Sequence, residues 1–288
     1  MLVAVDVGNT QTVIGVFVDA APPIDRSARP KGELPGLLHH WRVATVVDRT
    51  ADELAIMIQQ LLATAGIGVP GRGSLADNVG SSGMVGGIVA SSSVPSLTAA
   101  MREMVASWFD VPFVLIEPGI RTGMPILYDN PREVGADRIA NAVGAFDLFG
   151  GPAVVVDFGT TTNFDIVSAS GEFLGGAIAL GLEISMDALF ARAAALPRVE
   201  LVAPKNAVGR STVESMQSGA IFGHAGLVDG MCRRILAETG PATVIATGGL
   251  AGIVAPHTES IEVVEPWLTL HGLSLLFGRN LGETSSAR

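Results

Sequence analysis

The stretch AVVVDFGTTTNFDI, residues Ala153 to Ile166, decides the fold of this chain. Apolar and mostly β-branched residues lead into Asp157, and a second apolar-alternating run follows Gly159 and three threonines, which predicts strand, tight turn and strand. The glycine lets the backbone approach a ligand closely, and the threonines add hydroxyls beside the exposed amides of the turn. Such a turn after a buried acid suits a metal-bound polyphosphate. The alternative is an ordinary β-hairpin with an Asp turn.

The motif occurs twice, which favours the binding interpretation. LVAVDVGNTQTVIGVF spans Leu2 to Phe17, and its segment Val5 to Thr12 aligns without gaps on Val156 to Asn163. At a similar distance downstream of each copy, an apolar strand breaks into small residues, IVASSSVPSL from Ile88 and VIATGGLAGI from Val244. Self-similarity at half-chain scale predicts two lobes of similar fold.

The charge of the chain excludes some classes of partner. A formal net charge of −10 over 288 residues provides no basic surface for nucleic acid or for an anionic membrane, so we expect neither as a partner. Lysine occurs only at Lys31 and Lys205, and the absence of a G-x-x-x-x-G-K-[ST] motif excludes a P-loop. An anionic ligand must therefore be held locally, by backbone amides, metal ions or single arginines.

Cysteine use and apolar runs indicate a soluble, cytoplasmic protein. Cys232 is the only cysteine and lies in an apolar helical pattern, which predicts a core thiol and excludes an internal disulfide or a cysteine-based zinc cluster. The first strand contains Asp6, which a secretory signal would not carry, and the apolar run near Leu174 to Leu182 is too short to cross a bilayer. No metal-ligand spacing links the histidines, which we expect to be structural or surface residues: His39, His40, His224, His257 and His271.

Length and pattern predict an α/β fold of two domains, each with its own core. In the first lobe the order β-β-β-α-β-α-β indicates a mixed sheet with helices packed on it, and Thr50 with Glu53 forms a capping box for the first helix. The turn-rich segment Glu117 to Met124 divides the chain into domains 1–118 and 119–288, with the last helix able to pack back on the first domain. Further expected elements are strands at 41–45, 86–91, 111–116 and 243–249, helices at 51–66, 95–109, 139–150 and 212–239, loops at 19–37 and 66–87, and a frayed tail at 284–288.

The paired Asp-x-Gly-[NT]-T hairpins and the late T-G-G-L resemble motifs of a large superfamily that includes acetate and sugar kinases, actin and the heat-shock chaperone ATPases. Within it, the chain resembles type III pantothenate kinase over nearly its whole length. The resemblance rests on DVGNTQTV from Asp6, YDNPREVGADRIANAVGA from Tyr128, DFGTTTNFD from Asp157 and GRSTVESMQSG from Gly209.

The resemblance implies both a fold and a reaction. The fold is a pair of duplicated ribonuclease H-like (actin-like ATPase) domains, each a mixed β-sheet flanked by helices. The reaction is ATP-dependent phosphorylation of pantothenate to 4'-phosphopantothenate, the first step of coenzyme A biosynthesis. The loops at 19–37 and 66–87 are longer than the family usually has, and Leu180 and Asn163 stand where proline and threonine are more usual. None of these departures touches a position that we assign to chemistry.

The first hairpin is the expected site for the phosphates of ATP. Donors from Gly8 to Thr12 can wrap the β- and γ-phosphates, and Asp6 would hold Mg²⁺ directly or through water, because a hydrated hard cation needs only one or two carboxylates. At Asp157 the resemblance implies a monovalent cation, K⁺ or NH₄⁺, which supplies the charge that a P-loop lysine would provide. Glycines after the late strand would let adenosine lie close to the backbone, although such a strand end is often only a turn. The expected ATP contacts are Asp6, Val7, Gly8, Asn9, Thr10, Gln11, Thr12, Val13, Thr160, Gly248 and Gly249.

Asp137, in the GADR segment at the start of a predicted helix, is the expected general base. An acid in this position could equally compensate the helix dipole, and it is the resemblance that assigns it the proton of the acceptor hydroxyl. Arg138 would clamp the carboxylate of pantothenate, and its alternative is a surface ion pair with Glu133. The resemblance implies the further pantothenate contacts Tyr128, Gly135, Ala136 and Thr212.

The resemblance also implies a homodimer in which the acceptor site is completed at the interface. Two other functions remain open at this point. One is a kinase of the same fold that acts on another small hydroxy acid. The other is a non-catalytic transcriptional accessory factor, a label that members of this family have received. The net charge of −10 and the lack of a helix-turn-helix argue against direct DNA contact.

Overall fold

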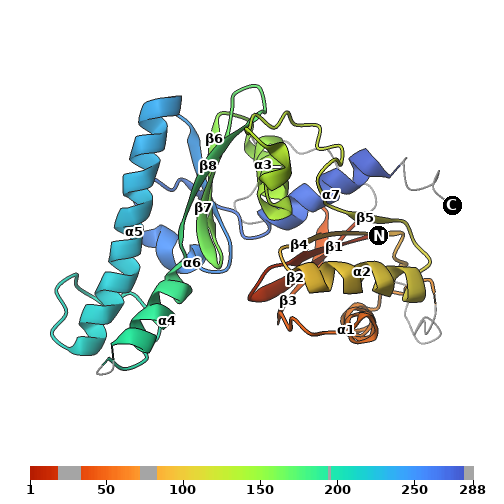
Figure 1. Ribbon diagram of the computed structural model, residues 1–288, viewed down its shortest axis with the longest axis horizontal. Coiled ribbons are helices and arrows are strands. Elements are labelled where there is room, and N and C mark those ends of the chain that lie inside the picture. The colour runs from red at the N-terminus through yellow and green to blue at the C-terminus, as the bar shows by residue number, and fades with distance from the viewer. Residues whose placement is uncertain (19–33, 72–82, 194–195, 282–288) are drawn as a thin grey trace.

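The structure is a computed structural model that describes residues 1–18, 34–71, 83–193 and 196–281. It contains two five-stranded sheets, with strand orders β3-β2-β1-β4-β5 and β8-β7-β6-β9-β10 (Figure 1). The two orders are equivalent. In each sheet the first strand pairs antiparallel with the second and the second with the third, whereas the third pairs parallel with the fourth and the fourth with the fifth. The duplication predicted from the two hairpin motifs is therefore confirmed as two mixed sheets of the same topology.

Each sheet is built around one of the duplicated hairpins, and helices cover its faces. The hairpin strands are β1 Leu2–Val7, β2 Gln11–Phe17, β6 Ala153–Phe158 and β7 Thr161–Val167. The other strands are β3 Leu37–Ala44, β4 Gly87–Ser92, β5 Phe113–Leu115, β8 Phe173–Leu180, β9 Thr243–Thr247 and β10 Val263–Val264. The α-helices are α1 Ala51–Thr64, α2 Pro95–Trp108, α3 Ala136–Phe149, α4 Leu182–Arg192, α5 Thr212–Thr239, α6 Ala251–Val254 and α7 Leu268–Asn280, and short 3-10 turns lie at Pro131–Glu133 and Ala255–His257.

Most of the predicted elements are confirmed, and the differences have local causes. The capping box of Thr50 and Glu53 is present at the start of α1, and α5 has the predicted bounds. The third strand was predicted from residue 41, which is wrong, because β3 keeps pairing with β2 back to Leu37 and its exposed polar residues give no alternation. The strand predicted at 111–116 is shorter, at Phe113–Leu115. The loop predicted at 19–37 and the tail at 284–288 fall largely or wholly outside the described residues, as does half of the loop predicted at 66–87.

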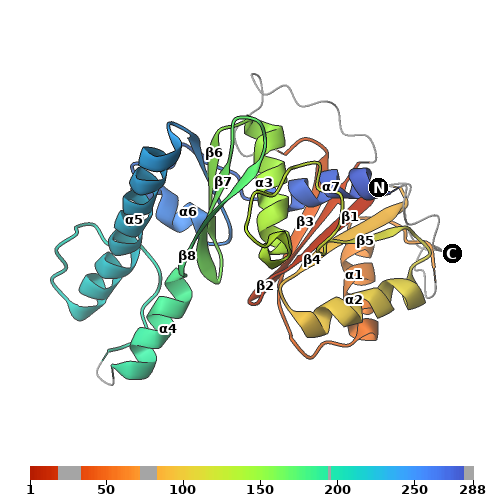
Figure 2. The same cartoon turned by 45° about the horizontal axis from the view of Figure 1, so that its top comes forward.

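The two sheets enclose a central layer formed by α3 and α7 (Figures 1 and 2). One apolar core contains Ala4 and Val89 from the first sheet, Val155 from the second, and Ala140 and Leu273 from the two central helices. A second core lies between the first sheet and α1 with α2, and a third lies between the second sheet and α4, α5 and α6. The order of layers is therefore helices, sheet, α3 with α7, sheet, helices.

The two central helices cross with their backbones in close contact. A Cβ atom on Gly272 of α7 would lie 1.8 Å from the carbonyl oxygen of Ala140 on α3. On the other side of the crossing, a Cβ atom on Gly144 would lie 2.8 Å from the carbonyl oxygen of Leu268. Since real Cβ atoms do not come so close to backbone oxygens, only glycine fits at Gly272 without moving a helix.

The last helix links the two halves of the chain. It follows the second sheet in sequence but packs on β1, β2 and β4 of the first sheet as well as on α3. The domain boundary near residue 118 stays a prediction. Cys232 is fully buried, as the apolar helical pattern predicted. None of the helices in the described ranges has the length and apolar character needed to cross a membrane.

Substitution of Gly272 tests the helix crossing. Gly272→Ala should lower the free energy of unfolding by about 2 kcal/mol or more, because the added methyl overlaps the Ala140 carbonyl and forces α3 and α7 apart. Gly278→Ala, in the same helix with nothing within 4 Å of the added Cβ, should instead stabilise by roughly 0.5–1 kcal/mol. Urea unfolding of both variants measures the difference, and equal effects at the two sites would contradict the close crossing.

Candidate functional site

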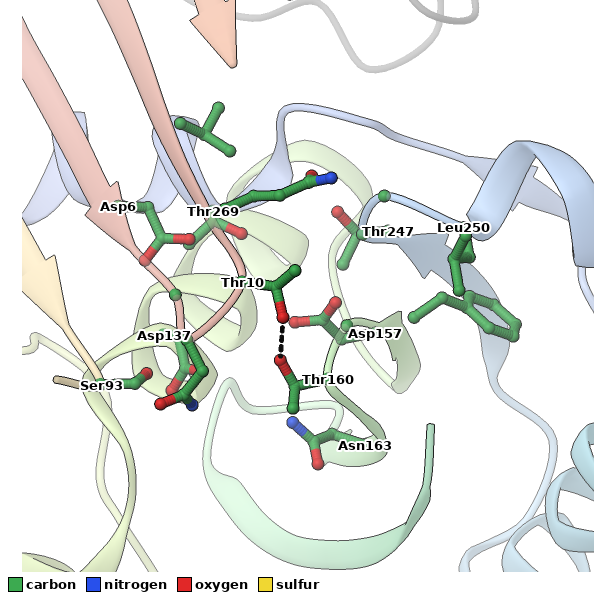
Figure 3. A pocket seen from close by; sticks show the side chains of 18 of the residues that line it. Asp6, Thr10, Ser93, Asp137, Asp157, Thr160, Asn163, Thr247, Leu250 and Thr269 are labelled. Atoms are coloured by element: carbon green, nitrogen blue, oxygen red, sulfur yellow. Dashed lines mark hydrogen bonds between the residues drawn. The ribbon is translucent and has the colours of Figure 1, made fainter. Parts of the chain in front are cut away.

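A cleft lies where the turns of the two duplicated hairpins face each other, and the two turns touch. The hydroxyl oxygens of Thr10 and Thr160 lie 3.2 Å apart and share a hydrogen bond (Figure 3). The cleft is lined by most of the predicted nucleotide and catalytic positions: Asp6, Gly8, Asn9, Thr10, Gln11, Val13, Asp137, Asp157, Thr160, Gly248 and Gly249. The tertiary structure thus brings residues of both halves of the chain into one site.

Two of the predicted ATP contacts lie behind the cleft wall. Val7 and Thr12 are buried, at 2% and 4% exposure. The hydroxyl of Thr12 is 2.9 Å from that of Thr45, which donates to the carbonyl of Gly8 at 2.8 Å. These contacts hold the shape of the first turn, and a contact of Val7 or Thr12 with the ligand stays a prediction.

Asp6 and Asp157 occupy equivalent places at the ends of β1 and β6, and the pKa of each carboxyl lies near 7. Burial raises the pKa of Asp6 to about 7, the negative charge of Asp137 adds to this rise, and the hydrogen bond from Ser91 at 2.6 Å opposes it. Burial likewise raises the pKa of Asp157 to about 7, with further contributions from Asp137 and Asp165. Neither carboxyl has a basic partner in contact among the described residues, so each would be stabilised in its ionised form by a cation.

The surroundings of Asp157 fit a cation. Asn141 of α3 donates from Nδ2 to Asp157 Oδ2 at 2.9 Å, and Thr269 of α7 donates to Asn141 Oδ1 at 2.7 Å. Thr247 lies beside Asp157 in the parallel register of β6 and β9, and its buried hydroxyl has no hydrogen-bond partner in the described part of the chain. A carboxylate and an unpaired hydroxyl oxygen are hard donors of the kind that bind such ions.

A metal in this cleft would need ligands beyond the protein. Across residues 1–18, 34–71, 83–193 and 196–281, no group of three His, Cys, Asp or Glu side chains is placed to hold a metal ion. Mg²⁺ commonly keeps several waters and binds through one or two carboxylates plus substrate phosphates. Asp6 therefore fits the role of a carboxylate that holds Mg²⁺ together with a polyphosphate.

Asp137 lies in the first turn of α3, two residues after the N-cap Gly135, and faces the cleft (Figure 3). One of its carboxyl oxygens accepts from the backbone N–H of Arg138 at 2.9 Å. It therefore occupies the position of a dipole-compensating acid and also lies beside the two hairpin turns. An acid here can accept a proton from a hydroxyl that enters the cleft.

The partner of Arg138 is Asp165 on β7. Nε and Nη2 of the arginine lie 2.7 and 2.6 Å from the same Asp165 oxygen, and both side chains are buried. The alternative ion pair with Glu133 is wrong, because Arg138 points inward while Glu133 accepts from Asn130 at the surface. The second carboxyl oxygen of Asp165 has no hydrogen-bond partner among the described residues.

The other predicted acceptor contacts do not gather in the cleft of a single chain. Tyr128 packs against Phe173, with ring centroids 6.3 Å apart. Gly135 and Ala136 line a neighbouring hollow beside the cleft, and Thr212 lines a separate shallow hollow at the start of α5. Their contact with an acceptor stays a prediction.

Several cleft residues were missed by sequence reasoning. The sequence did contain a pattern that could have identified Thr247, because Thr247 is the counterpart of Ser91 in the duplicated strands. Arg42 on the edge strand β3 and Trp267 before α7 had none, since each reaches the cleft only through the packing of separate elements. The lining residues outside the predicted set are Arg42, Ser93, Phe158, Gly159, Thr161, Asn163, Glu183, Thr247, Leu250, Pro266, Trp267, Thr269 and Leu270.

Known proteins resemble this chain in sequence and in fold. The model of the type III pantothenate kinase family matches residues 2–234. A type III pantothenate kinase from Acidothermus cellulolyticus is 49% identical over 98% of this chain and 100% of its own length, and one from Frankia casuarinae is 50% identical over 98% and 100%. Among solved structures, an activator of 2-hydroxyisocaproyl-CoA dehydratase from Clostridium difficile, with bound ADPNP, aligns with a TM-score of 0.51, covering 100% of this chain and 98% of that one. At 11% identity this last likeness is one of fold alone.

Replacement of Asp6 tests the electrostatic cost of the cleft. The folded pKa of about 7 lies above the usual 3.8, so the folded state binds this proton more tightly than the unfolded chain does. The ionised form therefore destabilises the cation-free protein above pH 7, and this penalty fades as the pH falls towards 4. Asp6→Asn should raise the melting temperature by about 2–6 °C at pH 8 and by much less at pH 5.

Asp187→Asn provides the matched control, because the Asp187 side chain is 65% exposed and forms only a surface ion pair with Arg198. Thermal unfolding should differ little between this variant and the parent at either pH. A rise for Asp6→Asn that is the same at pH 8 and pH 5 would contradict the raised pKa of Asp6.

Proposed function

Because the chain belongs to the type III pantothenate kinase family and thus phosphorylates pantothenate in coenzyme A biosynthesis, we propose that its cleft binds ATP between the two hairpin turns and presents the acceptor hydroxyl to Asp137. The observation that carries these residue roles is that Asp137 lines the same cleft as both turns. Phosphoryl transfer needs positioning, charge neutralisation and a proton acceptor, and the cleft contains groups suited to each task.

The first turn binds the phosphates that react. Gly8 to Gln11 offer backbone amides and short side chains, and the Thr10 hydroxyl already points across the cleft to Thr160. When the nucleotide enters, these two hydroxyls exchange their mutual hydrogen bond for phosphate oxygens. Gly248 and Gly249 on the other side leave room for adenosine near the backbone.

Asp6 and Asp157, whose carboxyl pKa values lie near 7, are the groups that would bind the cations. Asp6 would hold Mg²⁺ with the nucleotide. Asp157, beside the Thr247 hydroxyl that has no hydrogen-bond partner among the described residues, would hold the monovalent cation, K⁺ or NH₄⁺. When bound, these ions neutralise the charge that the phosphates and carboxylates bring together. Because each carboxyl must ionise to bind its cation, cation affinity falls as the pH drops below about 7.

Asp137 is the general base. Its carboxylate accepts the proton of the primary hydroxyl of pantothenate as that oxygen bonds to the γ-phosphorus. The bond between the γ-phosphorus and the β–γ bridging oxygen breaks, and ADP leaves with that oxygen. The neighbouring Arg138, fixed by Asp165, provides positive charge beside the acceptor and orients its carboxylate. Tyr128 contributes to the same side, because its ring packs against Phe173, over which the Arg138 guanidinium lies with Cζ 5.6 Å from the ring centroid.

We further propose that a second copy of the chain completes the acceptor side. Asn163 and Thr161 line the cleft, and their direct partners across β7 and β8 are Ile178 and Leu180. Directly opposite residues share a face of the sheet, so apolar side chains continue the cleft floor to the sheet edge. Ile178 and Leu180 are 62% and 66% exposed, which leaves an apolar face open beside the acceptor.

The position of Thr212 supports the same arrangement. It lies outside the cleft of its own chain, at the start of α5. If Thr212 contacts pantothenate, as the family resemblance implies, it does so from the partner subunit. A homodimer with isologous contacts would place one such residue at each of two acceptor sites.

The two rival functions are not favoured. Identity of 49% and 50% over 98% of the chain joins it to proteins named as type III pantothenate kinases, not to kinases of other hydroxy acids or to non-catalytic factors. The assay that tests the function measures pantothenate-dependent release of ADP by purified protein with ATP, Mg²⁺ and K⁺. No release above the pantothenate-free background would overturn the assignment.

Asp137→Asn tests the general base. The carboxamide keeps the size of the side chain but cannot accept the proton, so turnover should fall by about two or more orders of magnitude. ATP affinity and thermal unfolding should remain near those of the parent, since the nucleotide contacts lie on other segments. Near-normal turnover would move the base elsewhere, with Asp6 the next candidate.

Ile178→Glu tests the completed acceptor site. A charge on the apolar face of β8 should dissociate the dimer, measured as a halved mass by light scattering, and should lower kcat/KM for pantothenate by roughly tenfold or more. Ile56→Glu on α1, where Ile56 is 45% exposed in the first half of the chain, is the control and should change neither. A monomeric parent with full activity would refute the shared site.

A further inference from the structure

The cleft contains far more negative than positive charge, which is unfavourable for an anionic ligand. Asp6, Asp137, Asp157 and Glu183 line it, and Arg42 is the one lysine or arginine in the lining formed by the described residues. A polyphosphate adds several further negative charges. Cations bound at Asp6 and Asp157 would offset part of this repulsion. Among the described lining residues, Arg42 is the positive side chain that the protein itself provides.

Arg42 bridges the elements that are expected to hold the nucleotide. It lies on β3, in register with Val13 of β2, and its Nη1 donates to Gln11 Oε1 at 2.7 Å. A Cβ atom on Gly249 would lie 2.9 Å from the same nitrogen. The guanidinium therefore lies between the turn of the first hairpin and the glycine turn after β9, which belong to different sheets.

An aromatic support orients this guanidinium. Its Cζ lies 5.8 Å from the ring centroid of Trp267, and His40 stacks on the same indole with centroids 3.9 Å apart. Trp267 directly precedes α7, so the support belongs to the rigid central layer. Arginine stacked in this way keeps N–H groups of its planar fork available for phosphate oxygens, a geometry that lysine cannot reproduce.

We propose that Arg42 is a nucleotide-binding residue that contacts the α- and β-phosphates, which are not transferred. This rests on the proposed function, in which the first turn holds the β- and γ-phosphates and the Gly248–Gly249 turn lies near adenosine. The guanidinium lies between these two turns, so it faces the α- and β-phosphates, which link the γ-phosphate to adenosine. The contact is made equally with ATP and with the product ADP, so Arg42 supports nucleotide affinity and leaves the chemical step to other residues.

The electrostatic surroundings agree with this role. Arg42 lowers the pKa of both Asp6 and Asp157, against the larger effect of their burial. Its charge therefore acts at both carboxyls at which the cations are proposed to bind. The exposed guanidinium forms no ion pair with an acidic side chain among the described residues, where it contacts Gln11 and Trp267.

Arg42→Gln and Arg42→Lys test the proposal by calorimetric binding of MgADP and MgATP and by steady-state kinetics. Arg42→Gln should raise Kd for MgADP and for MgATP by a similar factor of about 10- to 100-fold, as expected for loss of charge-assisted hydrogen bonds. Arg42→Lys should lie between Gln and the parent. At saturating ATP, kcat should stay within about threefold of the parent value, and KM for pantothenate should not change.

Arg234→Gln is the matched control, because it removes the same charge from an exposed position on α5 away from the cleft. It should leave both Kd values unchanged, which separates a local contact from the effect of net charge. Thermal unfolding of each variant checks that the fold is retained.

Several outcomes would overturn the proposal. Unchanged Kd values for both nucleotides in folded Arg42→Gln would reduce Arg42 to a structural contact of Gln11 and Trp267. Weakened MgATP with unchanged MgADP and a lower kcat would assign the contact to the transferred phosphate instead. If the parent binds MgADP through Arg42 but releases no ADP in response to pantothenate, the proposed function fails while the role of Arg42 stands.

Discussion

The backbone contact between α3 and α7 is the constraint on which the rest of the molecule depends. With Gly272 against the Ala140 carbonyl, the two helices form one layer thin enough for both sheets to pack on it. Asp137 lies in the first turn of α3 and Thr269 in the first turn of α7, and both line the cleft. The packing of the two helices in the core therefore also positions two of the side chains that line the cleft.

The central layer also breaks the symmetry of the duplicated hairpins. Asp6 and Asp157 stand at matching ends of matching strands, beside Ser91 and Thr247 at equivalent register positions. Ser91 donates to Asp6, whereas Asp157 accepts from Asn141 of α3, and the Thr247 hydroxyl has no hydrogen-bond partner within the described parts of the chain. Since a carboxylate can only accept, Asn141 turns its amide nitrogen to Asp157 and its oxygen to Thr269. The carboxyl groups in the two copies of one motif thus accept from different hydrogen-bond donors.

Function and stability oppose each other in this cleft. Buried carboxyls with pKa values near 7 weaken the cation-free fold at neutral pH, because folding holds negative charges close together in a medium of low polarity. The same arrangement favours cations and the Mg²⁺ complex of a nucleotide, which remove the repulsion. Arg42 adds a fixed positive charge to the cleft lining, whereas the charge of the buried Arg138 is balanced by Asp165. Ligand binding should therefore stabilise the protein as well as position the reactants.

Local sequence determined much of this protein: the two hairpins, the capped helix at Thr50 and the duplicated mixed sheets. Through family motifs it also led to the proposed roles of the first turn and of Asp137. Such features are encoded within a few consecutive residues, since side-chain period, turn glycines and caps act over one or two turns of chain. The tertiary structure alone decided that Arg138 pairs with Asp165, that Asn141 joins Asp157 to Thr269, and that Arg42 reaches the cleft beside Trp267. Each of these contacts joins elements far apart in the chain through a single polar side chain, which leaves no periodic pattern, so it exists only once the sheets and central helices have packed.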